Sequence, residues 1–186
     1  MRSTFQPSSI RVVAGIGNSE EKYLTTYHNA GMRFVSFLLE KARETAPKKR
    51  RNSSFSLFTY PSGVSLLLSS LSMNLSGDAI KKALSLHSIQ PKNLLLVHDD
   101  SDLPLGSYRF SFGRGAAGHR GVQSVIETLG TNEFWRLRIG IRDPLTHRKK
   151  RAEDFVLSAM PPSHLQILQK TFSSISSAYD FIRLLS

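Results

Sequence analysis

Two short apolar runs end directly in polar residues, and this pattern limits the folds open to the chain. The run 10–18 (IRVVAGIGN) ends in a glycine-rich turn, and the run 93–100 (NLLLVHDD) ends in a histidine and two acids. Apolar runs of this length, bounded by turn residues, are typical of buried strands. Because ligands of α/β sheets bind beyond the carboxyl ends of the strands, we expect a functional site where these two runs end.

Helix-like and strand-like segments alternate along the rest of the chain. Helices are predicted where apolar residues recur every three to four positions, at 30–44, 75–89 and 119–130. Strands are predicted at 106–113 and 135–141, and a hairpin joins 55–60 to 64–70 across a Pro-Ser-Gly turn. The segment 47–54 (PKKRRNSS) is predicted to be a loop, and two short helices split by Pro161–Pro162 are predicted after Lys150.

Interleaved strands and helices predict an α/β fold with a central sheet. The hairpin indicates that this sheet is mixed and not purely parallel. The chain has 186 residues, which suits one domain. We expect residues 1–9 to form an N-terminal extension and residues 10–186 to form the single domain.

The chain is strongly basic, with a formal net charge of +11. This excess predicts a polyanionic partner, most plausibly nucleic acid, the alternative being a protein that is merely basic. Two clusters stand out, at Lys48–Arg51 and His147–Arg151, and each is either a binding patch or a solvated surface loop. Every long apolar run is far shorter than the roughly 20 residues of a membrane span, so no membrane is expected as a partner.

The absence of cysteine removes thiolate chemistry from consideration. His28 precedes a predicted helix, and a histidine next to a carboxylate makes a general base. With no cysteine and no G-x-S-x-G elbow, water is the more natural nucleophile. His98 and His119 compete with His28 for this role, and the three histidines are also possible metal ligands, although none has the spacing H-x-x-x-H.

The loop 113–118 (GRGAAG) matches the pattern G-x-G-x-x-G, which occurs in dinucleotide-binding proteins. That motif needs an acid at the far end of the following strand, but the nearest candidate, Glu133, precedes that strand. A dinucleotide site is therefore a weak hypothesis. The glycines still let the backbone approach a ligand closely at a helix start, and the alternative is a plain tight turn.

Three asparagines form a second group of candidate residues: Asn18, Asn29 and Asn74. The asparagine side chain offers both a donor and an acceptor, which suits a neutral ester or amide ligand. The structural alternative for Asn74 is a helix N-cap.

Six motifs follow one another between about Arg11 and Pro162: GIGN, YLTTYHNAG, MNLSG, HDDSDLPLG, GHRGVQSVIETLG and RLRIGI. In this order they resemble bacterial-type peptidyl-tRNA hydrolases. The resemblance implies a single α/β domain with a twisted mixed sheet. It also implies hydrolysis of the ester between a peptide and the terminal ribose of tRNA, which frees the tRNA for reuse, and it implies no metal or cofactor.

The resemblance also assigns roles to residues. His28 matches the family's catalytic base, and Asp99 matches its supporting aspartate. Residues matching those that bind the substrate's peptide or terminal nucleotide are Asn18, Tyr23, Ser72, Met73, Asn74 and Arg120. Residues expected to contact tRNA phosphates are Arg109, Arg114, Arg136 and Arg138.

The chain departs from the family pattern at several of these positions. Arg120 stands where the family usually has an asparagine that positions water or substrate. Arginine has no acceptor and is always charged, so it either binds the terminal phosphate or impairs water positioning. Ser72 replaces a usual aromatic residue, and Ser111 replaces a phosphate-binding lysine, although Arg109 and Arg114 lie near it.

These departures leave one functional alternative, a catalytically weakened RNA-binding relative that acts in splicing or at the ribosome. They resemble those of a diverged organellar member. The basic, acid-free N-terminus also favours mitochondria, with a bacterial cytoplasm as the alternative. We expect a monomer that meets its RNA partner directly.

Overall fold

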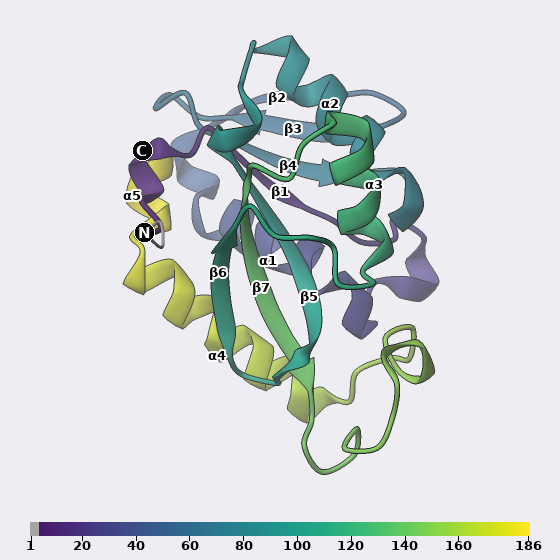
Figure 1. Cartoon of the computed structure of the whole chain (residues 1–186). Helices are drawn as coiled ribbons and strands as arrows, with labels where there is room; N and C mark the ends of the chain where they lie inside the picture. Colours follow the sequence, from purple (N-terminus) through teal and green to yellow (C-terminus); the bar gives the residue numbers. More distant parts are fainter. Residues whose placement is uncertain (1–3) are drawn as a thin grey trace.

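A seven-stranded sheet in the order β2-β3-β4-β1-β5-β7-β6 runs through the molecule (Figure 1). The structure is a computed structural model that describes residues 4–186. The strands are Val12–Gly15 (β1), Lys48–Arg51 (β2), Phe55–Thr59 (β3), Ser65–Ser69 (β4), Leu94–Pro104 (β5), Tyr108–Phe112 (β6) and Trp135–Arg142 (β7). Strand β1 runs parallel to β4 and β5, and β5 runs parallel to β7, whereas β2–β3, β3–β4 and β6–β7 are antiparallel. The prediction of a mixed α/β sheet is confirmed.

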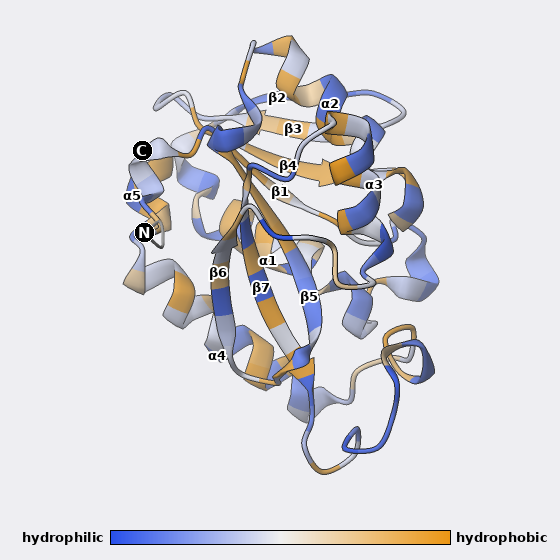
Figure 2. Ribbon diagram, in the orientation of Figure 1, coloured by the Kyte–Doolittle hydropathy of each residue, from blue (hydrophilic) through white to orange (hydrophobic). Residues whose placement is uncertain are grey.

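Helices cover both faces of the sheet (Figure 1). They are Ala30–Lys41 (α1), Ser76–Leu86 (α2), Arg120–Leu129 (α3), Pro162–Ala178 (α4) and Phe181–Leu185 (α5). One core layer joins α1, α4 and α5 to the sheet and includes Phe34, Leu95 and Phe172. The other joins α2 and α3 to the opposite face and includes Ile80 and Val125. Hydrophobic residues accordingly concentrate on the central strands (Figure 2), where both faces are buried.

Two predicted elements were wrong. Residues Lys48–Arg51 do not form a loop but the edge strand β2, paired with β3. All four side chains are exposed, and exposed cations on an edge strand discourage pairing with another chain. After Lys150 two α-helices are present, α4 and α5, but both follow Pro161 and α4 is long, so the predicted division at the prolines is wrong. Residues Ala152–Asp154 form only a 3-10 turn, and Pro162 begins the 17-residue helix α4, because proline suits the first turn of a helix.

The N-terminal segment packs on the domain. Phe5 is buried and stacks on Phe110, with ring centroids 4.0 Å apart, and it also contacts Trp135 and Tyr179. Residues 1–3 of the expected extension lie outside the described residues, so the division of the chain at residue 10 stays a prediction. Within residues 4–186, no helix combines the length and the apolar character needed to cross a membrane.

Helix α1 lies unusually close to the sheet because it carries Gly31. A Cβ atom added at Gly31 would overlap the backbone oxygen of Val97 in β5. A glycine in the first turn therefore lets the start of α1, and the residues before it, approach the carboxyl ends of the central strands.

We expect Gly31→Ala to lower the free energy of unfolding by about 1–3 kcal/mol, the usual range for overpacking a close contact. The added methyl group would push α1 away from β5. Thermal or denaturant unfolding of the variant measures the loss. Gly63→Ala provides a control for a glycine with open space around it, although its φ of +83° adds its own strain. A Gly31 variant as stable as the wild type would contradict the close packing.

Candidate active site

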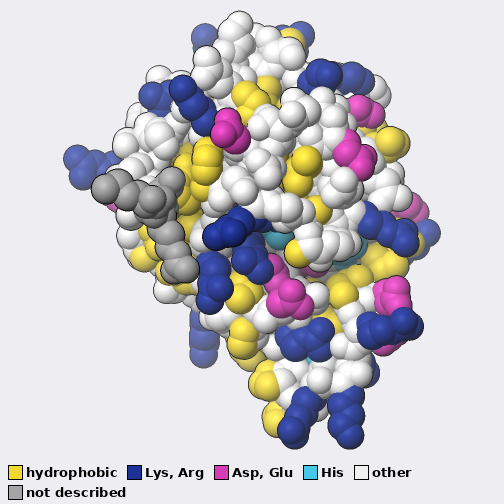
Figure 3. All heavy atoms as spheres, in the orientation of Figure 1, with side chains coloured by type: hydrophobic (Ala, Val, Ile, Leu, Met, Phe, Trp, Pro, Cys, Tyr) yellow, Lys and Arg dark blue, Asp and Glu magenta, His cyan; other side chains and the backbone are white. Residues whose placement is uncertain are grey.

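A cavity of about 1650 Å³ opens where β5 continues beyond its neighbour β1. Strand β1 pairs with β5 only as far as Val97, whereas β5 runs on to Pro104 beside β7. The residues of β5 after Val97 therefore have no strand partner on the β1 side, and the turn that carries His28 packs there. Figure 3 shows histidine side chains at the bottom of the hollow in this face. The expectation that the first and fifth strands meet at one site is correct, although the two acids lie inside β5 and not at its end.

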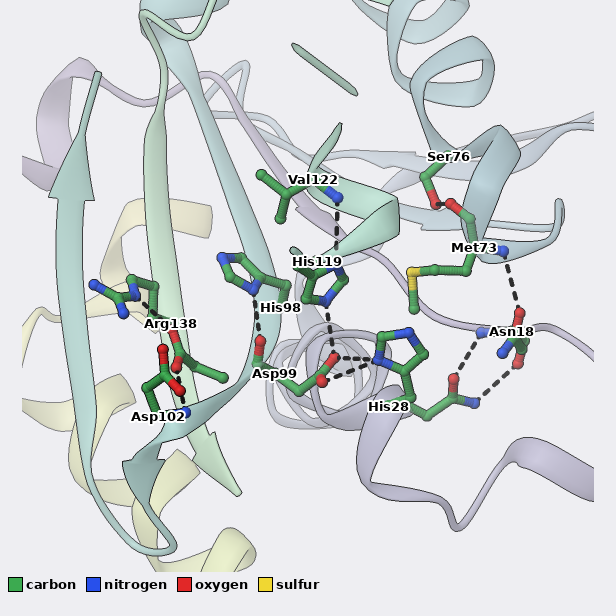
Figure 4. Close-up of polar contacts among 12 residues, drawn as sticks. Asn18, His28, Met73, Ser76, His98, Asp99, Asp102, His119, Val122 and Arg138 are labelled. Atoms are coloured by element: carbon green, nitrogen blue, oxygen red, sulfur yellow. Dashed lines mark hydrogen bonds and ion pairs between the residues drawn. The ribbon is translucent and has the colours of Figure 1, made fainter. Parts of the chain in front are cut away.

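His28 and Asp99 form a hydrogen-bonded pair in this cavity (Figure 4). The Nδ1 atom of His28 lies 3.0 and 2.9 Å from the two carboxylate oxygens of Asp99. His28 sits in the 3-10 turn Tyr27–Asn29 that leads into α1, and its backbone N–H donates to the carbonyl of Val156. Because Nδ1 donates to the carboxylate, the Nε2 atom of the neutral ring is left with a free lone pair.

A second imidazole binds the same carboxylate. The Nε2 atom of His119 lies 3.1 Å from Oδ1 of Asp99, and its Nδ1 atom accepts the backbone N–H of Val122 as the N-cap of α3. Accepting at Nδ1 fixes the tautomer of the neutral ring, so Nε2 carries the proton and donates it to Asp99. His119 therefore helps to orient Asp99, and sequence reasoning, which treated it as a rival of His28 or as a metal ligand, missed this contact.

His98, the other candidate for the general base, is buried and does not contact the Asp99 carboxylate. Its Nδ1–H donates to the backbone carbonyl of Asp99, 2.6 Å away, and its Nε2 atom has no hydrogen-bond partner within residues 4–186. Burial, together with the nearby His119 and Arg136, holds the pKa of His98 well below its ordinary value. His98 is therefore a neutral structural histidine in this fold.

The charges around His28 and Asp99 favour the ionised form of the Asp99 carboxyl group and raise the pKa of the His28 imidazole. Burial opposes ionisation of Asp99, but His28 and His119 together hold its pKa far below the ordinary value. Burial lowers the pKa of His28, the charge and hydrogen bond of Asp99 raise it, and Arg120 lowers it; the net shift is upward. His28 is thus the group in this cavity suited to take a proton near neutral pH.

The ligand atoms of His28, Asp99 and His119 lie within 4.8 Å of one another, a spacing at which three such groups could hold a metal ion. The hydrogen bonds to the Asp99 carboxylate account for the same short distances. The Asp99 carboxylate is thus shared by two imidazoles.

Asparagine side chains shape the wall next to His28. The side chain of Asn29 accepts the backbone N–H of Asn18 and donates to its carbonyl, at 2.7 and 2.9 Å, and the side chain of Asn18 accepts the N–H of Met73 at 3.1 Å. Asn74 is exposed on the cavity wall with Ser72 and Met73. The N-cap position of α2 is Leu75, so the alternative of Asn74 as a cap is wrong.

Four arginines line the opposite side of the cavity: Arg109, Arg114, Arg136 and Arg138. The antiparallel register places Arg109 opposite Arg138 and Ser111 opposite Arg136, so these side chains share one face of β6 and β7. Arg138 is paired with Asp100 at 2.6 Å. Arg136 is buried, and burial with the neighbouring Arg138 lowers its pKa to about 10. The wall is therefore cationic and suited to anions.

The glycine loop 113–118 forms the rim between β6 and α3 and lines the cavity. Gly113 and Gly118 have φ values of +62° and +81°, which glycine adopts readily. Because β6 and β7 are antiparallel, the loop does not belong to the parallel βαβ unit that a dinucleotide motif requires. The weak dinucleotide hypothesis is thereby removed.

Two predicted site residues do not line the cavity, Asn29 and Tyr23. Asn29 is buried, and Tyr23 lies half-buried in the 3-10 turn Glu21–Tyr23. Other residues line the cavity without having been predicted at the site, among them Asp102, Glu153 and Val156. Glu153 and Val156 carried no sequence signal, because both belong to the irregular segment between β7 and α4, whereas Arg151, which also lines the cavity, belongs to the basic cluster His147–Arg151.

Arg120 stands at the first position of α3, lines the cavity and lowers the pKa of His28. We expect Arg120→Asn to raise this pKa, so that the rise of kcat with pH moves to higher pH while activity on the alkaline side is kept or increased. The pH profile of kcat measures the shift. Arg120→Lys, which keeps the charge, serves as the control. A large loss of kcat at all pH values in Arg120→Asn would show that the arginine has a catalytic role of its own.

A single α/β domain that holds a histidine–carboxylate pair beside a cationic wall has the features of a hydrolase that activates water against an anionic substrate. The peptidyl-tRNA hydrolase family model matches residues 12–184. The chain therefore belongs to the peptidyl-tRNA hydrolase family.

Individual relatives agree with this membership. Peptidyl-tRNA hydrolase of Sulfurihydrogenibium sp. is 36% identical over 165 residues, which cover 88% of this chain and 86% of that protein. The enzyme of Tropheryma whipplei is 36% identical over 174 residues, covering 94% and 88%. The crystal structure of peptidyl-tRNA hydrolase from Acinetobacter baumannii superposes with a TM-score of 0.78 at 30% identity and covers 98% of this chain and 91% of that one. The fold expected from the resemblance is thereby confirmed.

All three of these relatives are bacterial proteins. They are consistent with the alternative location, a bacterial cytoplasm, and do not support the mitochondrial location expected from the N-terminus.

Proposed function

We propose that the protein hydrolyses the ester between a peptide, or an N-blocked aminoacyl group, and the terminal ribose of tRNA, with His28 as the base. Hydrolysis of peptidyl-tRNA is the function of the family to which the chain belongs. The observation that carries the assignment of the base is the contact of His28 Nδ1 with both oxygens of Asp99, which leaves Nε2 free in the cavity.

In the proposed reaction, Nε2 of His28 removes a proton from a water molecule as the water oxygen attacks the ester carbonyl carbon. Asp99 stabilises the resulting imidazolium and keeps its ring in place. When the tetrahedral intermediate collapses, the bond between the carbonyl carbon and the ribose oxygen breaks. The imidazolium returns its proton to that oxygen, so the products are a free carboxylic acid and a tRNA with its terminal hydroxyl restored.

The two sides of the cavity suit the two halves of this substrate. The amide groups of Asn18 and Asn74 can bind peptide carbonyl and N–H groups, with Ser72 and Met73 beside them. The cationic wall of Arg109, Arg114, Arg136 and Arg138 suits tRNA phosphates. Arg120, between them at the start of α3, suits the terminal nucleotide, and Tyr23 is proposed to support the tRNA end from outside the cavity.

The test is release of an N-blocked amino acid from charged tRNA by the wild-type protein and by His28→Ala under identical conditions. The proposal requires release by the wild type and its loss in the variant. If neither protein releases the amino acid although both bind tRNA, the chain is an RNA-binding relative without the activity.

We further propose that the protein works as a monomer, since its cationic surface can meet RNA directly. Sedimentation at working concentration tests this, and a dimer would refute it.

A further inference from the structure

The loop that follows β7 carries a dense group of cations that the proposed reaction does not use. We define the basic loop as Asp143–Arg151. Arg148, Lys149 and Lys150 are exposed, and within residues 4–186 none of them has a carboxylate within ion-pair distance. Arg151 pairs with Glu153 at 2.8 Å and lines the cavity. The basic loop therefore continues the positive charge of the cavity outward.

The base of the basic loop is fixed by contacts within the protein. The guanidinium of Arg142 donates from one nitrogen to the carbonyls of His147 and Lys150, and from another to the carbonyl of Ser101 in β5. The carboxylate of Asp143 accepts the backbone N–H groups of the second and third residues after it and the hydroxyl of Thr146. Bonds to backbone groups hold the loop in one shape regardless of which side chains it presents.

His147 anchors the same loop to the segment that carries the catalytic base. It is buried and stacks on Phe155 with ring centroids 4.0 Å apart, and the ring of Tyr27 meets it edge-on at 5.0 Å. Tyr27 is the residue directly before His28, and its hydroxyl is 2.7 Å from a ring nitrogen of His164. The backbone that carries the exposed cations of the basic loop is therefore tied to the segment that carries His28.

Figure 1 shows this segment, between β7 and α4, projecting beyond the end of the sheet at which the cavity opens, and Figure 3 shows Lys and Arg side chains gathered at that end of the molecule. The other cationic run, Lys48–Arg51, lies on β2 at the opposite edge of the sheet from β6. Of the two cationic runs in the described part of the chain, only the basic loop lies next to the cavity. It is also the run that is tied to the segment carrying His28.

We propose that Arg148, Lys149 and Lys150 bind the phosphate backbone of the double-stranded acceptor arm of tRNA, outside the cavity that holds the ester end. This rests on the proposed function and adds the recognition of the duplex to it. Cations bind phosphates without reading the sequence, so the contact would add affinity for every tRNA and a steep dependence on salt. The contact would also select tRNA over short esters.

The test compares two substrates, N-blocked aminoacyl-tRNA and the same aminoacyl group on a trinucleotide that lacks the duplex. The variant Arg148→Gln/Lys149→Gln/Lys150→Gln is expected to lower the ratio of kcat/KM for tRNA to kcat/KM for the trinucleotide about tenfold. The slope of log(kcat/KM) for tRNA against log salt should become shallower by about two to three, since each lost phosphate contact contributes roughly one.

Two matched variants make the result specific. Lys48→Gln/Lys49→Gln/Arg50→Gln removes the same charge from β2 and is expected to change the ratio less than about twofold. Arg148→Lys/Lys149→Arg/Lys150→Arg keeps the charge and should keep the ratio. Thermal unfolding confirms that all variants fold. An equal loss in the β2 variant, or an equal loss on both substrates in the loop variant, would overturn the proposal.

The same variants separate this inference from the proposed function. If the wild type cleaves neither substrate, the proposed hydrolysis fails. Filter binding of uncharged tRNA, against a single-stranded RNA of the same length, then tests the basic loop alone. Weaker binding of tRNA by the loop variant, and not by the β2 variant, would support the duplex contact, and equal binding would refute it.

Discussion

Replacing His28 by alanine is expected to lower kcat for cleavage of N-blocked aminoacyl-tRNA by about 10²–10⁴-fold, the usual contribution of a positioned general base. The Nε2 atom of His28 is the free basic atom of the His28–Asp99 pair, and the variant leaves water without a proton acceptor. The arginines that line the opposite wall are untouched, so the KM for tRNA should change little. Single-turnover kinetics at saturating enzyme measures the chemical step directly.

The control is His87→Ala, which removes an exposed histidine at the end of α2, outside the cavity. It should leave kcat within about twofold, since surface substitutions away from a site are usually near neutral. Unchanged turnover in His28→Ala would refute the assignment of the base. Loss of tRNA binding along with turnover would mean that His28 is needed for the shape of the site.

Replacing Asp99 by asparagine is expected to lower kcat by a similar factor, about 10²–10⁴-fold, through a different route. The asparagine oxygen can accept from His28, but its amide N–H then faces the N–H of His119, and both are donors. The ring of His28 would lose its fixed orientation. The imidazolium that forms in the reaction would lose its counter-charge.

The pH profile distinguishes this loss from simple misfolding. The Asp99 carboxylate raises the pKa of His28, so without it that pKa should fall. The base is active when neutral. The acidic side of the pH profile of kcat should therefore move to lower pH, even as the maximum value of kcat falls. Arg120→Asn is expected to move the same side of the profile the other way. A profile of Asp99→Asn that keeps the wild-type midpoint would contradict the direct contact with His28.

The candidate site was predictable from sequence where a titratable side chain lies beside a helix or strand that has a clear apolar pattern. His28 and Asp99 lie 71 positions apart, yet each adjoins a strongly patterned segment, a helix start and a buried strand. The alternation of those segments predicts that they meet at one edge of a sheet. The motif resemblance then assigned the base and its carboxylate among several histidines and acids.

What could not be predicted depends on contacts that leave no local pattern. Strand β2 consists of four cations, and only pairing with β3 makes it a strand. The partnership of His119 with Asp99 depends on how α3 is placed against β5, and the sequence around His119 identifies it only as a candidate base or metal ligand. The anchoring of residues 143–160 rests on backbone carbonyls and buried rings, and these have no characteristic spacing along the chain.

The backbone of the His28 segment is bound by residues that follow all seven strands in the chain. The N–H of His28 donates to Val156, the N–H of Met160 donates to Thr25, and Thr26 forms an isolated bridge with Ala159. During synthesis these residues leave the ribosome late, after all seven strands have been made. A growing polypeptide on the ribosome is itself a peptidyl-tRNA. The nascent enzyme therefore cannot complete its catalytic site until its last strand and the segment after that strand have been made.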